Sequence, residues 1–305
     1  MNAWIGVDLG GTHLRTALMN DQGQMLGMAK TDTMAGQGVC AVLYRIADTI
    51  RLLPGWEKAK GIGLGVPGGV LKDGETIVLA NNLIGFDGFH VRSYLSALMN
   101  KPVAMENDGN MACLAEALLG AGQGMDTVVY VTLSTGVGGG ICVGGRLLRG
   151  AHGCAGEFGC ISCDPRRAQI GDLPPGAIES EASGSALVRK AEENMHLAFS
   201  HAGEVYALAA SGNADAALLA DQAIQDLAVT LSNIASALDP DVIVLGGGLM
   251  KSADYILPRL TACFSDFVQP VFRDTPILRG CLTEPGLIGA ALYAKRMLAS
   301  SNPAL

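Results

Sequence analysis

The sequence predicts an α/β protein, because apolar strand-like runs alternate with longer segments of helical periodicity and the chain opens on a hairpin. The 305 residues are 49% hydrophobic, enough to bury the core of one large domain or two smaller ones. The net charge is −8 and no basic block stands out, which argues against nucleic acid or an anionic membrane as the main partner.

The composition also indicates a cytoplasmic protein. The eight cysteines are thinly spread, which favours reduced thiols over a disulfide framework. No basic segment followed by an apolar one precedes Asp8, so we expect no signal peptide. No apolar run reaches eighteen residues, so we expect no membrane span.

Residues 4–27 predict the opening hairpin. Ile5 and Val7 form an apolar strand that ends at Asp8, a glycine turn follows, and a second strand-like pattern resumes at Leu14. The predicted turn exposes its backbone groups beside the single carboxylate of Asp8.

Further strands and helices follow in order along the chain. The predicted strands are 61–66, 103–105, 127–133, 139–143 and 241–245. The predicted helices are 38–53, 109–120, 214–238 and 286–298. A strand–glycine turn–strand pattern at 133–140 loosely repeats the opening hairpin, which hints at internal duplication. We place a boundary near 120–124, giving a smaller domain of residues 1–120 with 286–305 and a larger one of residues 121–285.

Three glycine turns end apolar strands, at 8–12, 133–140 and 244–248. Glycine lets several N–H groups approach a phosphate closely, and Thr or Ser adds a hydroxyl donor. Each turn alone is compatible with a purely structural bend, but three together favour a nucleotide phosphate. None has the spacing of a P-loop or of a dinucleotide-binding fingerprint. Asp8 is placed to hold Mg²⁺ through water.

The segment Glu106-Asn107-Asp108 follows a predicted strand. A carboxylate at such a position can accept a proton from an alcohol that attacks a phosphate, which makes Asp108 a candidate general base. The alternative is that Asp108 caps the helix that follows it.

Seven motifs follow one another along nearly the whole chain: DLGGTHLR, GVPGGV, NNLIGFDG, END, STGVGGGI, GAHGCAGEFG and LDPDVIVLGGG. In this order and spacing they resemble the ROK family, which comprises bacterial sugar kinases and related repressors. The resemblance implies a two-domain, actin-like (ribonuclease H-like) ATPase fold with a cleft between the domains. It also implies ATP- and Mg²⁺-dependent phosphorylation of a hexose or hexose derivative at the 6-hydroxyl, and a homodimer.

The same resemblance assigns site residues, with Asp108 as the base. The implied sugar contacts are Gly68, Asn82, Asn107, Asp108, Glu157, Cys160 and Glu179. The implied nucleotide contacts are Asp8, Gly10, Gly11, Thr12, Ser134, Thr135, Gly136, Gly246, Gly247 and Gly248. Carboxylates and amides suit the fixed donor and acceptor directions of sugar hydroxyls.

The chain departs from the family pattern after Glu157. Cys160 stands where most members have a histidine that touches the sugar, and a thiol is a weak hydrogen-bonding partner, so the preferred hexose is open. Most members then carry three cysteines that bind a structural zinc; those positions here hold Ile170, Asp172 and Ala177. We therefore expect no structural zinc. The alternative ligand set is Cys154, Cys160 and Cys163 with His152 or Asp172.

Two other functions compete with the kinase. A sugar-responsive repressor of the family carries a DNA-binding segment ahead of the first motif, whereas seven residues precede Asp8 here. A sugar-binding or sugar-sensing protein without catalysis is the second alternative. Within the kinase hypothesis, the candidate acceptors are glucose, allose, fructose, mannose, N-acetylglucosamine and N-acetylmannosamine.

Overall fold

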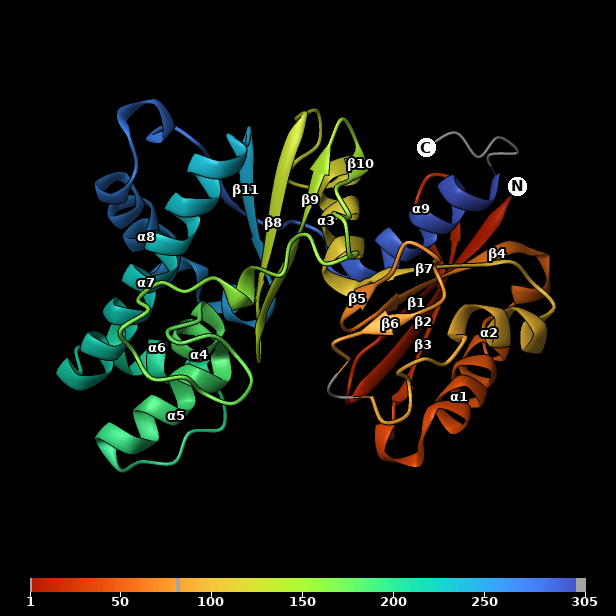
Figure 1. Ribbon diagram of the computed structural model, residues 1–305, viewed down its shortest axis with the longest axis horizontal. Helices are drawn as coiled ribbons and strands as arrows, with labels where there is room; N and C mark the ends of the chain where they lie inside the picture. The colour runs from red at the N-terminus through yellow and green to blue at the C-terminus, as the bar shows by residue number, and fades with distance from the viewer. Residues whose placement is uncertain (1, 81–82, 300–305) are drawn as a thin grey trace. The chain divides into compact units, whose positions relative to one another are not determined.

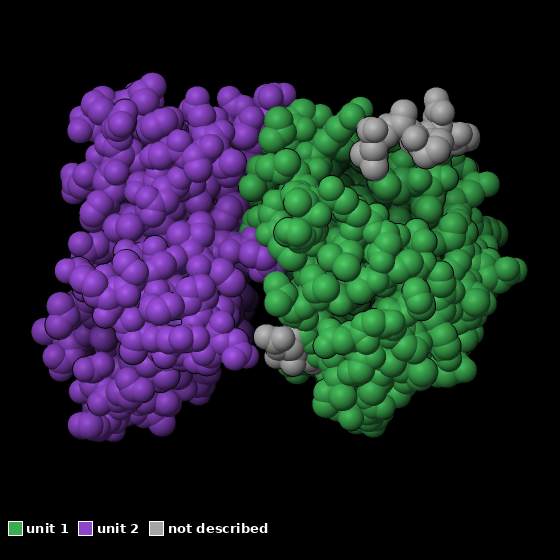
Figure 2. Space-filling model, in the orientation of Figure 1, with its two compact units in different colours: residues 1–123, 140–156, 282–305 green, residues 124–139, 157–281 purple. Residues whose placement is uncertain are grey.

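The computed structural model describes residues 2–80 and 83–299 of the chain. The chain folds into two compact units (Figure 2). Unit 1 comprises Met1–Gln123, Gly140–Gly156 and Leu282–Leu305, and unit 2 comprises Gly124–Gly139 and Glu157–Cys281. Segment 140–156 thus groups with the N-terminal residues, a grouping that the domain boundaries predicted from the sequence do not include. Within the described ranges, no helix has the combined length and hydrophobicity needed to cross a membrane.

A five-stranded sheet forms the centre of unit 1. Strands β1 and β2 are antiparallel, with Val7 opposite Thr16, which confirms the predicted opening hairpin. Strands β1, β4 and β7 run parallel. In spatial order the strands are β3 (Met25–Asp32), β2 (His13–Asn20), β1 (Ala3–Leu9), β4 (Ala59–Val66) and β7 (Val103–Asn107).

Strand β1 sends alternate side chains to two apolar layers. Ile5, Val7 and Leu9 belong to a core that also contains α1 (Val39–Arg51) and α2 (Val91–Met99). Trp4 belongs to a second core with α9 (Pro285–Ala299). This period of two is what a strand buried on both faces requires, and Figure 1 shows α1 and α2 lying together beside the sheet.

The remaining elements of unit 1 are the helix α3, a short hairpin and two 3₁₀ turns. Helix α3 (Asp108–Leu119) begins directly after β7 and packs against α9. The hairpin β5 (Gly69–Val70) and β6 (Ile77–Val78) forms a small separate sheet. Two short 3₁₀ turns are η1 (Ala35–Gln37) and η2 (Trp56–Lys58).

Helix α9 approaches the sheet of unit 1 so closely that glycine is required on both sides. A Cβ atom on Gly63 of β4 would lie 1.8 Å from the Ala290 carbonyl oxygen, and one on Gly6 of β1 would lie 2.2 Å from the Leu287 carbonyl oxygen. On the helix itself, a Cβ on Gly289 would lie 1.7 Å from the Met111 oxygen of α3. Backbone therefore packs directly on backbone around α9.

Strands β8, β11 and β12 of unit 2 are parallel and belong to a second five-stranded sheet, whose strand β10 lies in the segment 140–156 of unit 1. Residues Gly139 and Gly140, at the boundary between the units, both lie in β9. The two sheets place their strands in the same sequential order, as the loose repeat in the sequence suggests. The order is β10 (Arg146–Leu147), β9 (Val137–Val143), β8 (Thr127–Leu133), β11 (Val242–Gly246) and β12 (Ile277–Arg279).

Helix α7 is the central helix of unit 2. It spans Ala214–Leu238, as predicted, and packs against α4, α5, α6 and α8. The other elements are η3 (Phe158–Cys160), α4 (Ile178–Ala182), α5 (Gly184–Met195), α6 (Ala202–Ala210), η4 (Gly248–Ser252), α8 (Ala253–Phe267) and η5 (Pro270–Phe272).

We expect Gly63→Ala to lower the free energy of unfolding by about 3 kcal/mol, because the added methyl group must push α9 away from the sheet. Gly36→Ala is the matched control, since a Cβ there meets nothing within 4 Å. Urea unfolding of both variants measures the difference. Equal unfolding midpoints for Gly63→Ala and the wild type would contradict the close packing of α9.

Candidate active site

The tip of the opening hairpin in unit 1 is held by backbone hydrogen bonds. The Gly10 N–H donates to the His13 carbonyl at 2.9 Å, and the Thr33 N–H donates to the Thr12 carbonyl at 2.8 Å. The Thr33 hydroxyl donates to the Gly10 carbonyl at 2.6 Å. Thr12 remains exposed, with Gly11 half-buried beside it. The tip is thus a braced turn whose surface carries no large side chain.

Asp8 lies half-buried at the end of β1, beside Arg15. The Arg15 guanidinium donates to Asp8 Oδ2 at 3.2 Å and to Glu284 Oε2 at 3.4 Å. Burial raises the pKa of Asp8, Arg15 opposes that rise, and the charge of Glu284 adds to it. The carboxylate oxygens of Asp8 and Glu284 are ligands of the type that Mg²⁺ prefers, so these residues fit a magnesium ion held through water. Sequence reasoning missed Glu284, an isolated acid before α9.

Asn107 joins two motifs that lie far apart in the sequence of unit 1. Its Nδ2 donates to the Gly68 carbonyl at 3.0 Å, and its Oδ1 accepts from the Asn110 N–H at 3.0 Å. Gly68 has φ 83°, and a Cβ there would lie 2.4 Å from the Val78 carbonyl oxygen. The turn at Gly68 therefore requires glycine and contacts Asn107 directly.

Asp108 is the first residue of α3, and Asn107 is the residue that caps this helix. The alternative in which Asp108 serves as the cap is therefore wrong, because the Asn107 side chain already accepts the hydrogen bond that a cap receives. Asp108 is half-buried, and its Oδ1 accepts from the Gly109 N–H at 2.8 Å.

Glu106 precedes these residues, and sequence reasoning gave it no role. Its carboxylate is fully buried and forms an ion pair with Arg149, with Oε2 2.6 Å from Nε. It also accepts hydrogen bonds from the Asn107 N–H at 2.8 Å and from Asn110 Nδ2 at 3.1 Å. Arg149 Nη2 donates to the Val70 carbonyl at 3.1 Å. This buried pair fixes the end of β7, from which Asn107 and Asp108 extend.

In unit 2 the two glycine turns lie together at the carboxyl ends of the neighbouring parallel strands β8 and β11. The Gly248 N–H donates to Ser134 Oγ at 3.5 Å. Gly247 has φ 88°, and a Cβ there would lie 2.3 Å from the Leu133 carbonyl oxygen. The Gly184 N–H, at the start of α5, donates to the Ser134 carbonyl at 2.7 Å. Such a cluster of turns and helix start can bind phosphate oxygens.

Glu179 of α4 packs against the first of these turns. Its Oε2 accepts from the Val137 N–H at 2.8 Å, and a Cβ on Gly136 would lie 2.4 Å from the same oxygen. A Cβ on Gly159 of η3 would lie 3.2 Å from it. Glu179 is therefore fixed between the turn that follows β8 and η3.

Glu157 precedes the 3₁₀ turn η3, and Cys160 is its last residue. The Cys160 N–H donates to the Glu157 carbonyl at 3.2 Å, and the Cys160 side chain is exposed. Burial raises the pKa of the Glu157 carboxyl, and the charge of Glu179 raises it further. Glu157, whose pKa Glu179 raises, thus lies beside an exposed thiol in unit 2.

The segment in which most family members bind zinc does not fit a zinc ion in this chain. No group of three or more His, Cys, Asp or Glu side chains in residues 2–80 and 83–299 is arranged to hold a metal. The Cys163 thiol donates to the Gly176 carbonyl at 3.2 Å, and burial raises its pKa to about 11. Whether the purified protein carries zinc stays a prediction.

The predicted residues are divided between the two units. Unit 1 brings Gly68 to Asn107 and Asp108, and it also contains the hairpin tip at 10–12 with Asp8. Unit 2 brings Ser134, Thr135 and Gly136 beside Gly246–Gly248 and places Glu179 near Glu157. Asn82, the remaining predicted sugar contact, lies outside the described residues.

Comparison with known proteins gives a consistent result. The family model described as "ROK family" matches residues 4–297. A glucokinase of Halalkalibacterium halodurans is 32% identical over 96% of this chain and 95% of its own length. A ROK hexokinase structure from Thermus thermophilus has a TM-score of 0.87 at 32% identity, covering 98% of this chain and all of that one.

A ROK family glucokinase from Streptomyces griseus, solved with glucose and AMPPNP, has a TM-score of 0.83 at 27% identity. It covers 97% of this chain and all of its own. These similarities extend over both units and confirm the α/β, two-domain actin-like ATPase fold expected from the motifs. The chain belongs to the ROK family.

Proposed function

We propose that this ROK-family sugar kinase transfers the γ-phosphoryl group of ATP to the 6-hydroxyl of a hexose or hexose derivative, with Asp108 as general base. The observation that carries the proposal is the place of Asp108: its half-buried carboxylate belongs to the first residue of α3, directly after β7 and next to Asn107, which bonds to the turn at Gly68. Glu106, the other acid of this segment, is neutralised by Arg149. A carboxylate in that position can accept a hydroxyl proton.

The sugar contacts in this proposal are groups that recognise hydroxyls by direction. Asn107 has one amide hydrogen beyond the one given to Gly68, and Glu157 and Glu179 offer carboxylate oxygens. Cys160 lies exposed next to Glu157 and would meet the same ligand through a weakly polar sulfur. The set proposed for the sugar is Gly68, Asn82, Asn107, Asp108, Glu157, Cys160 and Glu179.

The nucleotide contacts are the side-chain-poor turns of both units. We assign the terminal phosphates to Gly10–Thr12 and to Ser134–Gly136, and the α-phosphate and ribose to Gly246–Gly248. Asp8 would hold Mg²⁺ through water, with Arg15 and Glu284 fixing its carboxylate. The ion, when bound, supplies positive charge to the phosphate oxygens.

In the proposed reaction the γ-phosphoryl group passes from ATP to the sugar hydroxyl, and Asp108 accepts the hydroxyl proton. Asp108 accepts the proton of the attacking hydroxyl while the new O–P bond forms, and the bond from phosphorus to the bridging oxygen of ATP breaks. ADP keeps the electron pair of that bond and leaves, and Asp108 returns the proton to solvent. The turns bind the phosphates through N–H groups that require no rearrangement during the reaction.

A non-catalytic sugar-binding or sugar-sensing protein is the alternative function. We expect turnover with at least one hexose when glucose, allose, fructose, mannose, N-acetylglucosamine and N-acetylmannosamine are offered at saturating MgATP. A coupled assay of ADP release measures it. Sugar binding by calorimetry with no ADP release for any of these sugars would favour the alternative.

Asp108→Asn should lower kcat by at least ~10² while sugar affinity stays within about threefold, because the amide keeps the shape of the side chain but cannot accept the proton. Steady-state kinetics and calorimetric sugar binding check the two parts. Asp48→Asn, which changes an exposed acid of α1, is the control. Undiminished turnover in Asp108→Asn would remove Asp108 from the role of base.

The acidic limb of kcat/KM for the sugar should follow the ionisation of Glu157. Because burial and Glu179 raise the pKa of Glu157, its carboxylate is lost at a higher pH than that of an ordinary glutamate as the solution is acidified. Glu179→Gln removes a negative neighbour, lowers the Glu157 pKa and should shift the limb to lower pH. Profiles at saturating MgATP measure the shift, with Glu193→Gln as control. A limb that moves upward or stays fixed in Glu179→Gln would contradict the coupling.

A further inference from the structure

The loop 161–177 of unit 2 has little apolar anchoring of its own. Most of its side chains are exposed or half-buried. Its two ends pair with each other, since the Cys163 N–H donates to the Gly176 carbonyl at 2.9 Å and the Ile178 N–H donates to the Ile161 carbonyl at 2.8 Å. These bonds close the base of the loop at the start of α4 but do not attach the middle of the loop to the rest of unit 2.

Arg167 makes that attachment. Its Nη1 donates to Asp226 Oδ2 at 2.6 Å and to Glu181 Oε2 at 2.8 Å, and its Nη2 donates to Asp226 Oδ1 at 2.8 Å. Asp226 belongs to α7 and Glu181 to α4. One guanidinium therefore joins the loop to two helices, in the two-pronged geometry that arginine forms with carboxylates.

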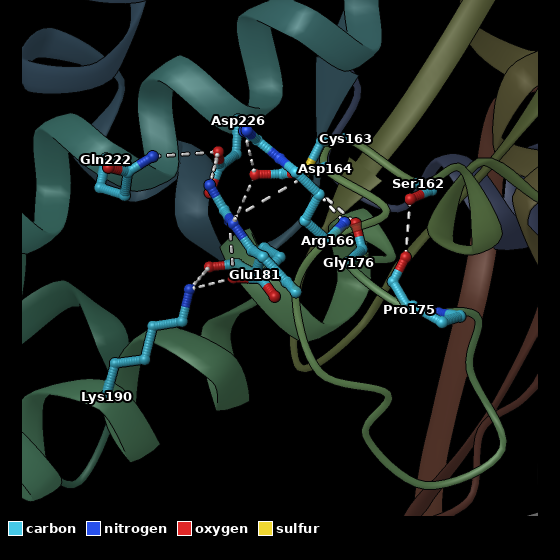
Figure 3. A network of polar contacts seen from close by, with 11 residues as sticks. Ser162, Cys163, Asp164, Arg166, Pro175, Gly176, Glu181, Lys190, Gln222 and Asp226 are labelled. Atoms are coloured by element: carbon cyan, nitrogen blue, oxygen red, sulfur yellow. Dashed lines mark hydrogen bonds and ion pairs between the residues drawn. The ribbon is translucent and has the colours of Figure 1, made fainter.

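The partners form a balanced, largely buried network. The side chains of Glu181 and Asp226 are 6% and 5% exposed. Lys190 of α5 lies 2.5 Å from Glu181 Oε2, and Gln222 donates to Asp226 at 3.1 Å. Figure 3 shows Lys190 of α5 approaching Glu181, and Gln222 approaching Asp226 from one turn earlier on the same helix, α7. Arg167 and Lys190 thus compensate the charges of the two buried carboxylates, and Asp164 of the loop lies 3.8 Å from Arg167 Nε.

The protonation states agree with this arrangement. Burial alone would raise the pKa of Glu181, but the hydrogen bonds and charges of Lys190 and Arg167 outweigh it, so the pKa is lowered. Asp226 raises the pKa of Arg167. Glu181 and Arg167 are therefore both charged at neutral pH.

The network reaches the proposed sugar site through α4. This helix has five residues, too few to be stable without contacts, and it carries both Glu181 and Glu179. Glu181 is held by Arg167 and Lys190, while Glu179 accepts the Val137 N–H at 2.8 Å. A shift of α4 would displace the Glu179 carboxylate from the turn after β8.

We propose that Arg167 is a positioning residue that fixes α4, and with it Glu179, through its ion pairs with Glu181 and Asp226, in place of a structural metal in this loop. The loop's residues do not fit zinc, and the guanidinium joins the same loop to the helices around it. The inference rests on the proposed role of Glu179 in sugar binding.

The first test compares Arg167→Met with Arg166→Met. Arg166 is the adjacent residue, 89% exposed, and bonds to Asp164. Arg167→Met should raise the KM for the sugar at least ~10-fold while kcat stays within about twofold, because α4 carries Glu179 whereas the proposed base Asp108 belongs to α3. Arg166→Met should match the wild type. A KM for the sugar in Arg167→Met that also matches the wild type would overturn the proposal.

Loss of Arg167 alone leaves Asp226 buried and unpaired, so this variant can fail to fold. Arg167→Met/Asp226→Asn removes both charges and should regain the wild-type Tm to within a few degrees. The sugar KM should remain raised, because the link from the loop to α4 is still missing. Arg167→Lys should restore part of the affinity, since lysine keeps the charge but not the two-pronged contact. Wild-type sugar KM in the double variant would overturn the positioning role.

Coupling through Glu179 is tested by combining substitutions. If Arg167 acts through Glu179, Glu179→Gln with the double variant should give the same sugar KM as Glu179→Gln alone. Multiplying effects would mean that Arg167 acts by another route and would overturn the proposal.

Amide hydrogen exchange separates this inference from the proposed function. Exchange at Val137 and in α4 should be at least ~10-fold faster in Arg167→Met/Asp226→Asn than in the wild type, whatever the enzyme phosphorylates. Unchanged exchange would refute the network's role. If Glu179→Gln leaves sugar KM unchanged while exchange still accelerates, the assignment of Glu179 to the sugar fails and the attachment of α4 by Arg167 stands.

Zinc content and the effect of a chelator on the Tm test whether Arg167 takes the place of a structural metal. Protein purified without added metal should contain well under one zinc per chain, and a chelator should leave its Tm unchanged. One zinc per chain, or a Tm lowered by the chelator, would overturn that part of the proposal.

Discussion

Direct contact between backbones, without intervening side chains, is the constraint on which the structure depends. In unit 1 it lets α9 press against β1 and β4 at Gly6 and Gly63. In unit 2 it lets the turn at Gly247 approach the end of β8. The first use builds a core and the second leaves N–H groups near the surface of a turn. The high glycine content therefore reflects two physical needs, close packing and anion binding, that the same residue type satisfies.

Acidic residues that look equivalent in the sequence have different roles in the structure, because their environments differ. Glu106 and Asp108 are two residues apart, yet Glu106 is fully buried against Arg149 and Asp108 is half-buried at the start of α3. In unit 2, Glu179 is fixed by the Val137 N–H, whereas the neighbouring Glu157 has a raised pKa. In the first pair Glu106, and in the second Glu179, is thus held by a defined contact with the framework.

The sequence predicted the elements with strong local signals. Strand β8 and helix α7 lie at their predicted limits, because each combines a clear period with buried apolar residues. Strand β3 was missed because it is an edge strand with an exposed pattern and exposed methionines at 25 and 28. Helix α4 was missed because five residues contain too little periodicity to recognise. The motifs located the glycine turns, but the pairing of Ser134 with Gly248 depends on two parallel strands becoming neighbours.

The contacts of Arg167 could not be predicted for a different reason. Its partner Asp226 lies 59 residues away, and no spacing rule links an arginine in a polar loop to an acid within a long helix. A metal site can be recognised in a sequence by repeated ligands of one type, whereas a charge network uses residue types that are common on any protein surface. A charge network also behaves differently from a metal site. Each buried charge depends on its partners, so loss of one partner leaves the others unpaired. Such a network anchors a loop only where the folded helices already hold its acids out of water, as α4 and α7 do here.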